Sequence, residues 1–101
     1  MSWYKILLPM RNENSIRLGF RISQAIEAQD LRNRQPNGVA LFSKPEQHDD
    51  GSDCWAYYLS PVAARITLPH LGKLTLEPCD RPDLEANGIS LLYGSYKPLL
   101  D

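Results

Sequence analysis

The stretch CWAYYLSPVAARI, residues 54–66, contains the transition that decides the fold. Its first part is rich in aromatic and aliphatic residues, which favour a β-strand. Ser60 and Pro61 then predict a helix start, because serine is a favoured N-cap and proline at the first helical position loses no hydrogen bond. Pro69 predicts that this helix ends near Leu68. The stretch therefore predicts a strand that leads directly into a helix.

Further strands are predicted on both sides of this transition. The expected strands are residues 3–9, 39–43, 54–60, 73–79 and 89–94. The polar segments 44–53 and 80–88 are rich in turn-forming residues and are expected to be loops. A long helix is expected from about Ser15 to Arg34, with Asn12 or Asn14 as a candidate N-cap.

The segment from Ile16 to Ile22 is compatible with two structures. Its apolar residues alternate with polar or small ones, which suits a strand. The spacing of Ile22 and Ile26, together with the good helix formers that follow, suits a helix. We expect one helix with Gly19 as its weak point; the alternative is a hairpin strand followed by a shorter helix.

The elements follow the order strand, helix, strand, strand, helix, strand, with one further strand at the end. This order predicts an α+β fold, specifically a ferredoxin-like (split βαβ) sandwich in which an antiparallel sheet carries two helices on one face. The 101 residues fit a single α+β domain, 1–101. Two helices on one face leave the other face of the sheet uncovered, and we expect function or a dimer partner there.

The charge of the chain excludes a general attraction to nucleic acid or to anionic membranes, since the formal net charge is −1. Arginines gather in the first third of the chain, which is compatible with a local basic patch on one helix. No segment has the length of a transmembrane helix, and the first ten residues lack the features of a secretory signal. We therefore expect a cytoplasmic protein with Cys54 and Cys79 as reduced thiols.

No motif in the sequence predicts a cofactor or a common catalytic site. The segment QHDDGSD, residues 47–53, contains His48 and three aspartates, but it has no second histidine for zinc and does not have the spacing of a calcium loop. We expect a solvated turn and no metal. The segment from Tyr57 to Arg65 resembles small bacterial proteins, and this resemblance implies no activity.

Aromatic residues on the predicted strands are candidates for a partner interface. The candidates are Trp3, Trp55, Tyr57 and Tyr93. On an uncovered sheet face they would bury a homodimer interface or recognise a protein partner. The alternative is that they are half-buried sheet residues of a monomer.

A second set of candidates would bind a small ligand. The helix start at Ser60 suits an anion, with Arg65 reaching back toward it, although simple capping explains the same residues. In an enzyme with a pocket between sheet and helices, Tyr58 and His70 would act as acid and base, and Arg65 would bind a substrate carboxylate. The leading hypothesis is a binding domain without catalytic activity, and the alternative is a small enzyme or a ligand-binding module.

Overall fold

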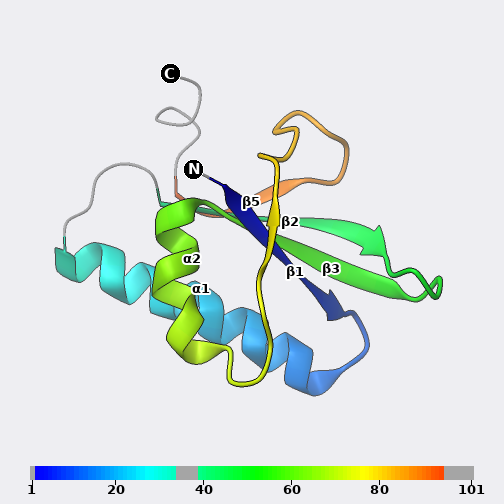
Figure 1. Cartoon of the computed structure of the whole chain (residues 1–101), viewed down its shortest axis with the longest axis horizontal. Helices are drawn as coiled ribbons and strands as arrows, with labels where there is room; N and C mark the ends of the chain where they lie inside the picture. Colours follow the sequence, from blue (N-terminus) through cyan, green and yellow to red (C-terminus); the bar gives the residue numbers. More distant parts are fainter. Residues whose placement is uncertain (1, 34–38, 95–101) are drawn as a thin grey trace.

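The computed structural model describes residues 2–33 and 39–94. The strands are β1 (Trp3–Pro9), β2 (Ala40–Gln47), β3 (Asp53–Leu59), β4 (Glu77–Cys79) and β5 (Ser90–Gly94). The helices are α1 (Glu13–Asn33) and α2 (Pro61–Thr67), and α2 continues into the short 3₁₀ helix η1 (Leu68–His70). The α+β class is confirmed: a five-stranded antiparallel sheet in the order β4-β1-β3-β2-β5 has two helices packed against it (Figure 1).

The ambiguous N-terminal segment is one helix, and the hairpin alternative is wrong. The side-chain oxygen of Asn12 accepts a hydrogen bond of 3.2 Å from the backbone N–H of Ser15, so Asn12 caps the start of α1 as expected. Gly19 does not interrupt the helix. The predicted helix end at Arg34 lies outside the described residues.

Two strand lengths differ from the prediction. β2 continues to Gln47, so residues 44–47 pair with β3 and do not belong to the expected loop. β5 pairs with β2 only as far as Ser43, and Pro45 therefore lies where β2 is an edge, a place where proline is tolerated. β4 is restricted to Glu77–Cys79, because Leu76 before it packs against the core instead of pairing with β1.

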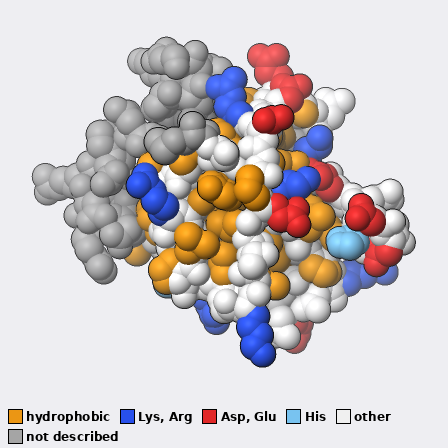
Figure 2. Space-filling view, viewed as in Figure 1, with side chains coloured by type: hydrophobic (Ala, Val, Ile, Leu, Met, Phe, Trp, Pro, Cys, Tyr) orange, Lys and Arg blue, Asp and Glu red, His pale blue; other side chains and the backbone are white. Residues whose placement is uncertain are grey.

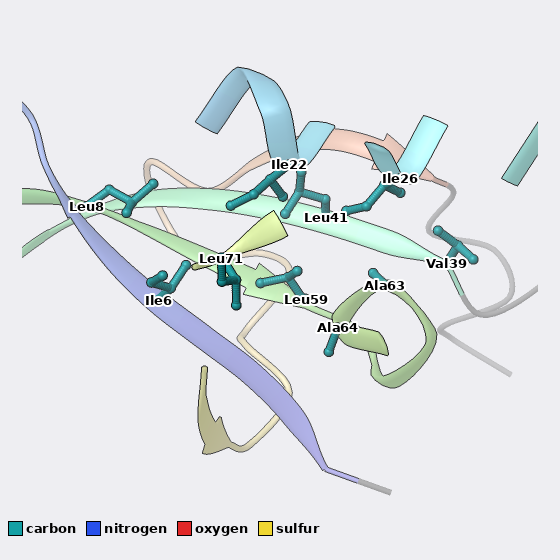
Figure 3. Close-up of a cluster of buried hydrophobic side chains, with 10 residues drawn as sticks. All are labelled: Ile6, Leu8, Ile22, Ile26, Val39, Leu41, Leu59, Ala63, Ala64 and Leu71. Atoms are coloured by element: carbon teal, nitrogen blue, oxygen red, sulfur yellow. The ribbon is translucent and has the colours of Figure 1, made fainter. Parts of the chain in front are cut away.

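The main core lies between the two helices and one face of the sheet, which we call the helix-bearing face. Ile22 and Ile26 of α1 meet Ala63 and Ala64 of α2 over strand residues that include Leu41 (Figure 3). Ile22 and Ile26 are fully buried. Both helices therefore belong to the same cluster of buried side chains.

The opposite face is partly covered, which differs from the expected open sheet. Trp3 and Phe42 are buried there, with ring centroids 6.1 Å apart. Leu84 and Ile89, from the segment between β4 and β5, pack against them. Loop side chains thus supply a second, smaller core where the prediction placed an exposed surface.

The view of Figure 2 shows how hydrophobic and charged side chains divide the surface. Hydrophobic side chains gather over the region of α2, β1 and β4, and most charged side chains lie toward the margins. None of the helices in residues 2–33 and 39–94 combines the length and the apolar character that a membrane crossing requires.

Candidate functional site

An apolar groove, which we call the α1 groove, lies between the first half of α1 and the helix-bearing face. Its volume is about 240 Å³. Four large hydrophobic side chains on its walls are exposed: Phe20 by 66%, Ile16 by 49%, Leu92 by 43% and Trp55 by 39%. Large apolar side chains that gather in this way are typical of binding surfaces.

The register of the sheet brings the strand side of the groove together. Leu8 of β1 lies directly opposite Trp55 of β3, so the two side chains share one face. The register between β2 and β5 shifts at Leu41, which leaves Leu92 as an extra residue on β5. Three separate strands therefore contribute one wall.

Gly19 controls how closely α1 approaches this wall. A Cβ atom at Gly19 would meet the hydroxyl group of Tyr57 and would lie 3.1 Å from the ring carbon that carries it. Burial raises the pKa of the Tyr57 phenol, as expected for a ring beneath a helix. Glycine is the residue that lets the helix lie directly on this tyrosine.

The Ser60 junction is a corner between two strands. Ser60 is 1% exposed, and its hydroxyl oxygen accepts a hydrogen bond of 2.9 Å from the backbone N–H of Ala40. The backbone N–H of Ser60 donates to the carbonyl of Ala40 at 3.1 Å. The side chain makes no capping bond to α2. Ser60 therefore joins the end of β3 to the start of β2.

The other ligand candidates lie in different places. Tyr58 is on the opposite face of the sheet, where its hydroxyl donates to Glu46, and Lys5 lies 3.8 Å from the same carboxylate. Burial and this bond to Glu46 raise the pKa of Tyr58. Arg65 is exposed on α2, and His70 is exposed on η1. The structure does not bring the four candidates into one pocket.

The four aromatic candidates also divide between the two faces. Trp55 and Tyr57 line the α1 groove, and Tyr93 packs against the main core on the same helix-bearing face. Trp3 belongs to the smaller core on the opposite face. An interface that contains Trp55 would therefore not contain Trp3, because the two residues lie on opposite faces of the sheet.

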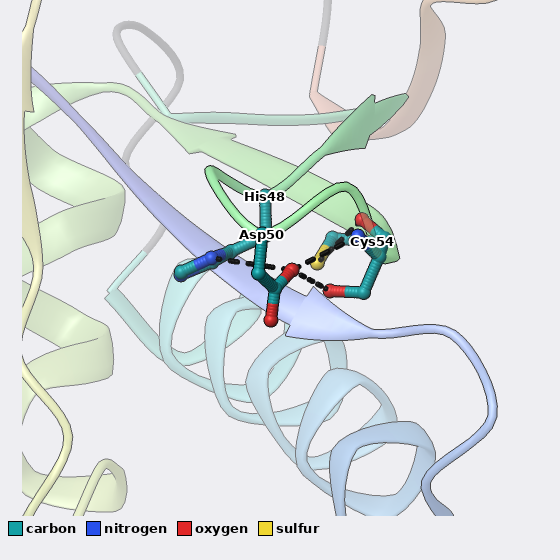
Figure 4. A network of polar contacts seen from close by, with 4 residues as sticks. His48, Asp50 and Cys54 are labelled. Carbon is teal, nitrogen blue, oxygen red and sulfur yellow. Dashed lines mark hydrogen bonds and ion pairs between the residues drawn. The ribbon is translucent and has the colours of Figure 1, made fainter.

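Residues 48–52 of the predicted solvated turn form the exposed β2–β3 turn, which holds a network of polar contacts (Figure 4). Asp50 accepts hydrogen bonds from the hydroxyl of Ser52 at 2.6 Å and from its backbone N–H at 2.9 Å, and these bonds lower the pKa of Asp50. His48 approaches Asp50 at 3.7 Å. Within the described part of the chain, no group of three or more potential metal ligands is assembled.

The two cysteines are free thiols at opposite ends of β1. Cys54 lies opposite Pro9, and Cys79 lies opposite Trp3. Six residues of strand separate these positions by roughly 20 Å. Burial raises the pKa of the Cys79 thiol. The two cysteines therefore do not form a pair.

Sequence reasoning missed Ile16, Phe20 and Leu92 as groove residues. A signal was present in α1: Ile16 and Phe20 are four residues apart and form a second apolar stripe beside the core stripe of Ile22 and Ile26. A helix with one buried face needs only one such stripe. Leu92 left no comparable signal, because its position depends on the bulge beside β2.

Comparison of the chain with protein-family models, curated proteins and solved structures finds no match in any of the three.

Proposed function

We propose that this protein is a binding domain without catalytic activity that self-associates through the α1 groove. The observation that carries the proposal is the exposure of Phe20, Ile16, Leu92 and Trp55 around one hollow. Burial of these side chains against another surface removes apolar area from water, which is the main favourable term in protein association.

A second copy of the chain is the occupant that the geometry supports best. Phe20 lines the groove and is also its most exposed side chain, so one patch offers both a projecting ring and a hollow for a ring. A two-fold interface needs a surface that is complementary to itself in this way. α1 has 21 residues and is about 30 Å long, enough to extend the contact toward the ~800 Å² per partner of a stable interface.

We also propose that the fold is a ferredoxin-like variant with β5 as an addition. The support is the order β4-β1-β3-β2, in which every neighbouring pair is antiparallel. α1 connects β1 to β2, and α2 connects β3 to β4. Each helix thus joins two strands that have one strand between them, as in a split βαβ unit.

A cytoplasmic location is part of the proposal. Its support is that Cys54 and Cys79 are free thiols, which suits a reducing compartment.

The test of self-association is the molar mass in solution of two matched variants, measured by light scattering over a concentration series. Phe20→Glu places a charge in the groove, and Leu68→Glu places the same charge on an exposed apolar residue of η1 outside it. We expect a dimer for the wild-type protein and for Leu68→Glu. Phe20→Glu should weaken the dimer about 30-fold or more, as at an interface hot spot.

Two results would overturn the proposal. One is a wild-type protein that stays monomeric up to several hundred micromolar. The other is a dimer that both variants weaken equally, since this would place the contact outside the α1 groove. A monomer that binds an unrelated protein through Phe20 would show the groove to be a partner site and self-association to be wrong.

A further inference from the structure

A second hollow lies on the other flank of α1 and has different chemistry. We call it the basic hollow; its volume is about 440 Å³. Arg17 and Arg21 line it from α1, and His70 lines it from η1. Leu18 and the buried Leu71 supply an apolar part. The size is within the range of sites that hold small molecules.

No ion pair among the described residues balances the charges around this hollow, although Glu13 in the first turn of α1 stands four positions before Arg17. Arg17 and Arg21 are four positions apart on a helix, so their side chains are neighbours and repel one another. No described carboxylate lies within ion-pair distance of either arginine or of His70, and no Asp or Glu lines the hollow. Two neighbouring guanidinium groups without an ion-pair partner are arranged to receive an anion.

The start of α1 brings groups of both signs to this region. Asn14 belongs to the first turn of the helix and lines the hollow. The first turn of an α-helix carries a partial positive charge. In α1 the carboxylate of Glu13 opposes this charge, and Asn12 already accepts the backbone N–H of Ser15. The two arginines and the hollow that they line, and not the helix start, therefore favour an anion, and the net charge of −1 makes this positive region local.

We propose that the basic hollow binds a small ligand that carries an oxyanion, phosphate or carboxylate, on an apolar body. Arg17 and Arg21 would bind the oxyanion through their guanidinium N–H groups. Leu18, Leu71 and Leu74 would contact the apolar body. This site shares only Ser15 with the lining of the α1 groove, and it does not depend on self-association.

The first experiment is a titration of the ¹⁵N-labelled protein, followed by the backbone amide signals. Phenyl phosphate and phenylacetate present the two oxyanions on the same ring, and benzyl alcohol is the uncharged control. We expect saturable shifts near residues 12–21 and 70–74 with at least one anion and none with benzyl alcohol. The anion that binds with the higher affinity identifies the oxyanion that the site prefers.

Three matched variants locate the binding. Arg17→Gln and Arg21→Gln should each lower the affinity for the more tightly bound anion about tenfold, since a hydrogen bond to a charged group is lost. Arg65→Gln removes an exposed arginine of α2 that does not line the hollow, and it should leave the affinity unchanged. All three arginines are exposed, so these variants should fold.

The proposal is overturned by either of two results. Absence of saturable shifts with both anions at 20 mM would show that the hollow binds no such ligand. An equal loss of affinity in all three arginine variants would show that the anions respond only to overall charge.

Discussion

The two flanks of α1 are made by one helix and present opposite chemistry. Ile16 and Phe20 line the α1 groove on one flank, and Arg17 and Arg21 line the basic hollow on the other. Successive residues of an α-helix point about 100° apart, so neighbouring residues in the sequence can line different surfaces of the helix. Between the flanks, Ile22 is buried in the core.

The difference shows how a small sheet protein can carry two surfaces on one element. The core uses a narrow stripe of α1, because α2 and the sheet already fill the space beneath it. Beside this stripe, the first half of α1 exposes an apolar set, Ile16 and Phe20, and a basic set, Arg17 and Arg21. The two sets can therefore be changed separately, which makes the comparison testable.

The largest effect is expected from Ile22→Ala, because this residue supports both flanks. Ile22 is fully buried, and truncation of such a side chain leaves a cavity that costs about 3 kcal/mol. Urea unfolding should show this loss, and both self-association and anion binding should weaken together. If the free energy of unfolding falls by less than about 1 kcal/mol, Ile22 does not support both flanks.

Ser60→Ala tests whether anion binding belongs to the basic hollow and not to the start of α2. The backbone N–H of Ala40 would lose its buried partner, at a cost of about 2 kcal/mol in unfolding free energy. Binding of the preferred anion should stay unchanged in the folded fraction. Ser52→Ala, which removes an exposed hydroxyl from the β2–β3 turn, is the matched control and should cost less. If Ser60→Ala loses affinity for the anion and Ser52→Ala does not, the anion binds at the start of α2.

Gly19→Ala should disturb the groove flank and spare the basic flank. The added methyl group meets the Tyr57 hydroxyl, and the strain should exceed the better helix propensity of alanine by about 1 kcal/mol. Chemical denaturation of Gly19→Ala, Tyr57→Phe and the double variant forms a thermodynamic cycle. The double variant should recover part of the loss. Strictly additive losses would show that the two residues do not touch.

The smallest effect is expected from Tyr58→Phe, which lies on the face away from both flanks. Loss of the Tyr58 hydroxyl removes the hydrogen bond to Glu46, which is worth about 1 kcal/mol at a partly exposed site. Neither binding surface should change. Because the pKa of Tyr58 is raised in the fold, its contribution is present below pH ~10 and is lost as the pH rises further. Stability measured between pH 9 and 11.5 should therefore fall less steeply in Tyr58→Phe than in the wild-type protein. An identical slope would mean that Tyr58 ionises equally in both states.

Local patterns predicted most of the elements, and their errors have local causes. β1 and β3 are continuous apolar and aromatic segments, and their prediction was correct within one residue. The polar end of β2 resembles a loop in composition, because Lys44 and Glu46 point to a face where charged side chains remain partly exposed. Strand pairing with β3 decided its structure, and pairing is not a local property.

The candidate surfaces were harder to predict than the fold. The sequence showed the arginines of the first third of the chain, but not that His70 lies across the hollow from them. The α1 groove needs Leu8, Trp55 and Leu92 in one place, and these residues come from three strands. Alternation along β3 correctly placed Trp55 and Tyr57 on one face, yet it could not tell which face carries the helices.

The position of β1 in the sheet has a consequence for synthesis of the protein. β1 precedes the other described strands in the sequence, yet it lies inside the sheet between β3 and β4. Tyr4 pairs with Leu59, and Trp3 pairs with Cys79, so one edge of β1 has no partner until β3 is made, and the other has none until β4 is made. Such distant contacts slow folding and leave apolar strand edges exposed to other chains. The growing chain is therefore expected to need protection from aggregation until residue 59 has emerged from the ribosome.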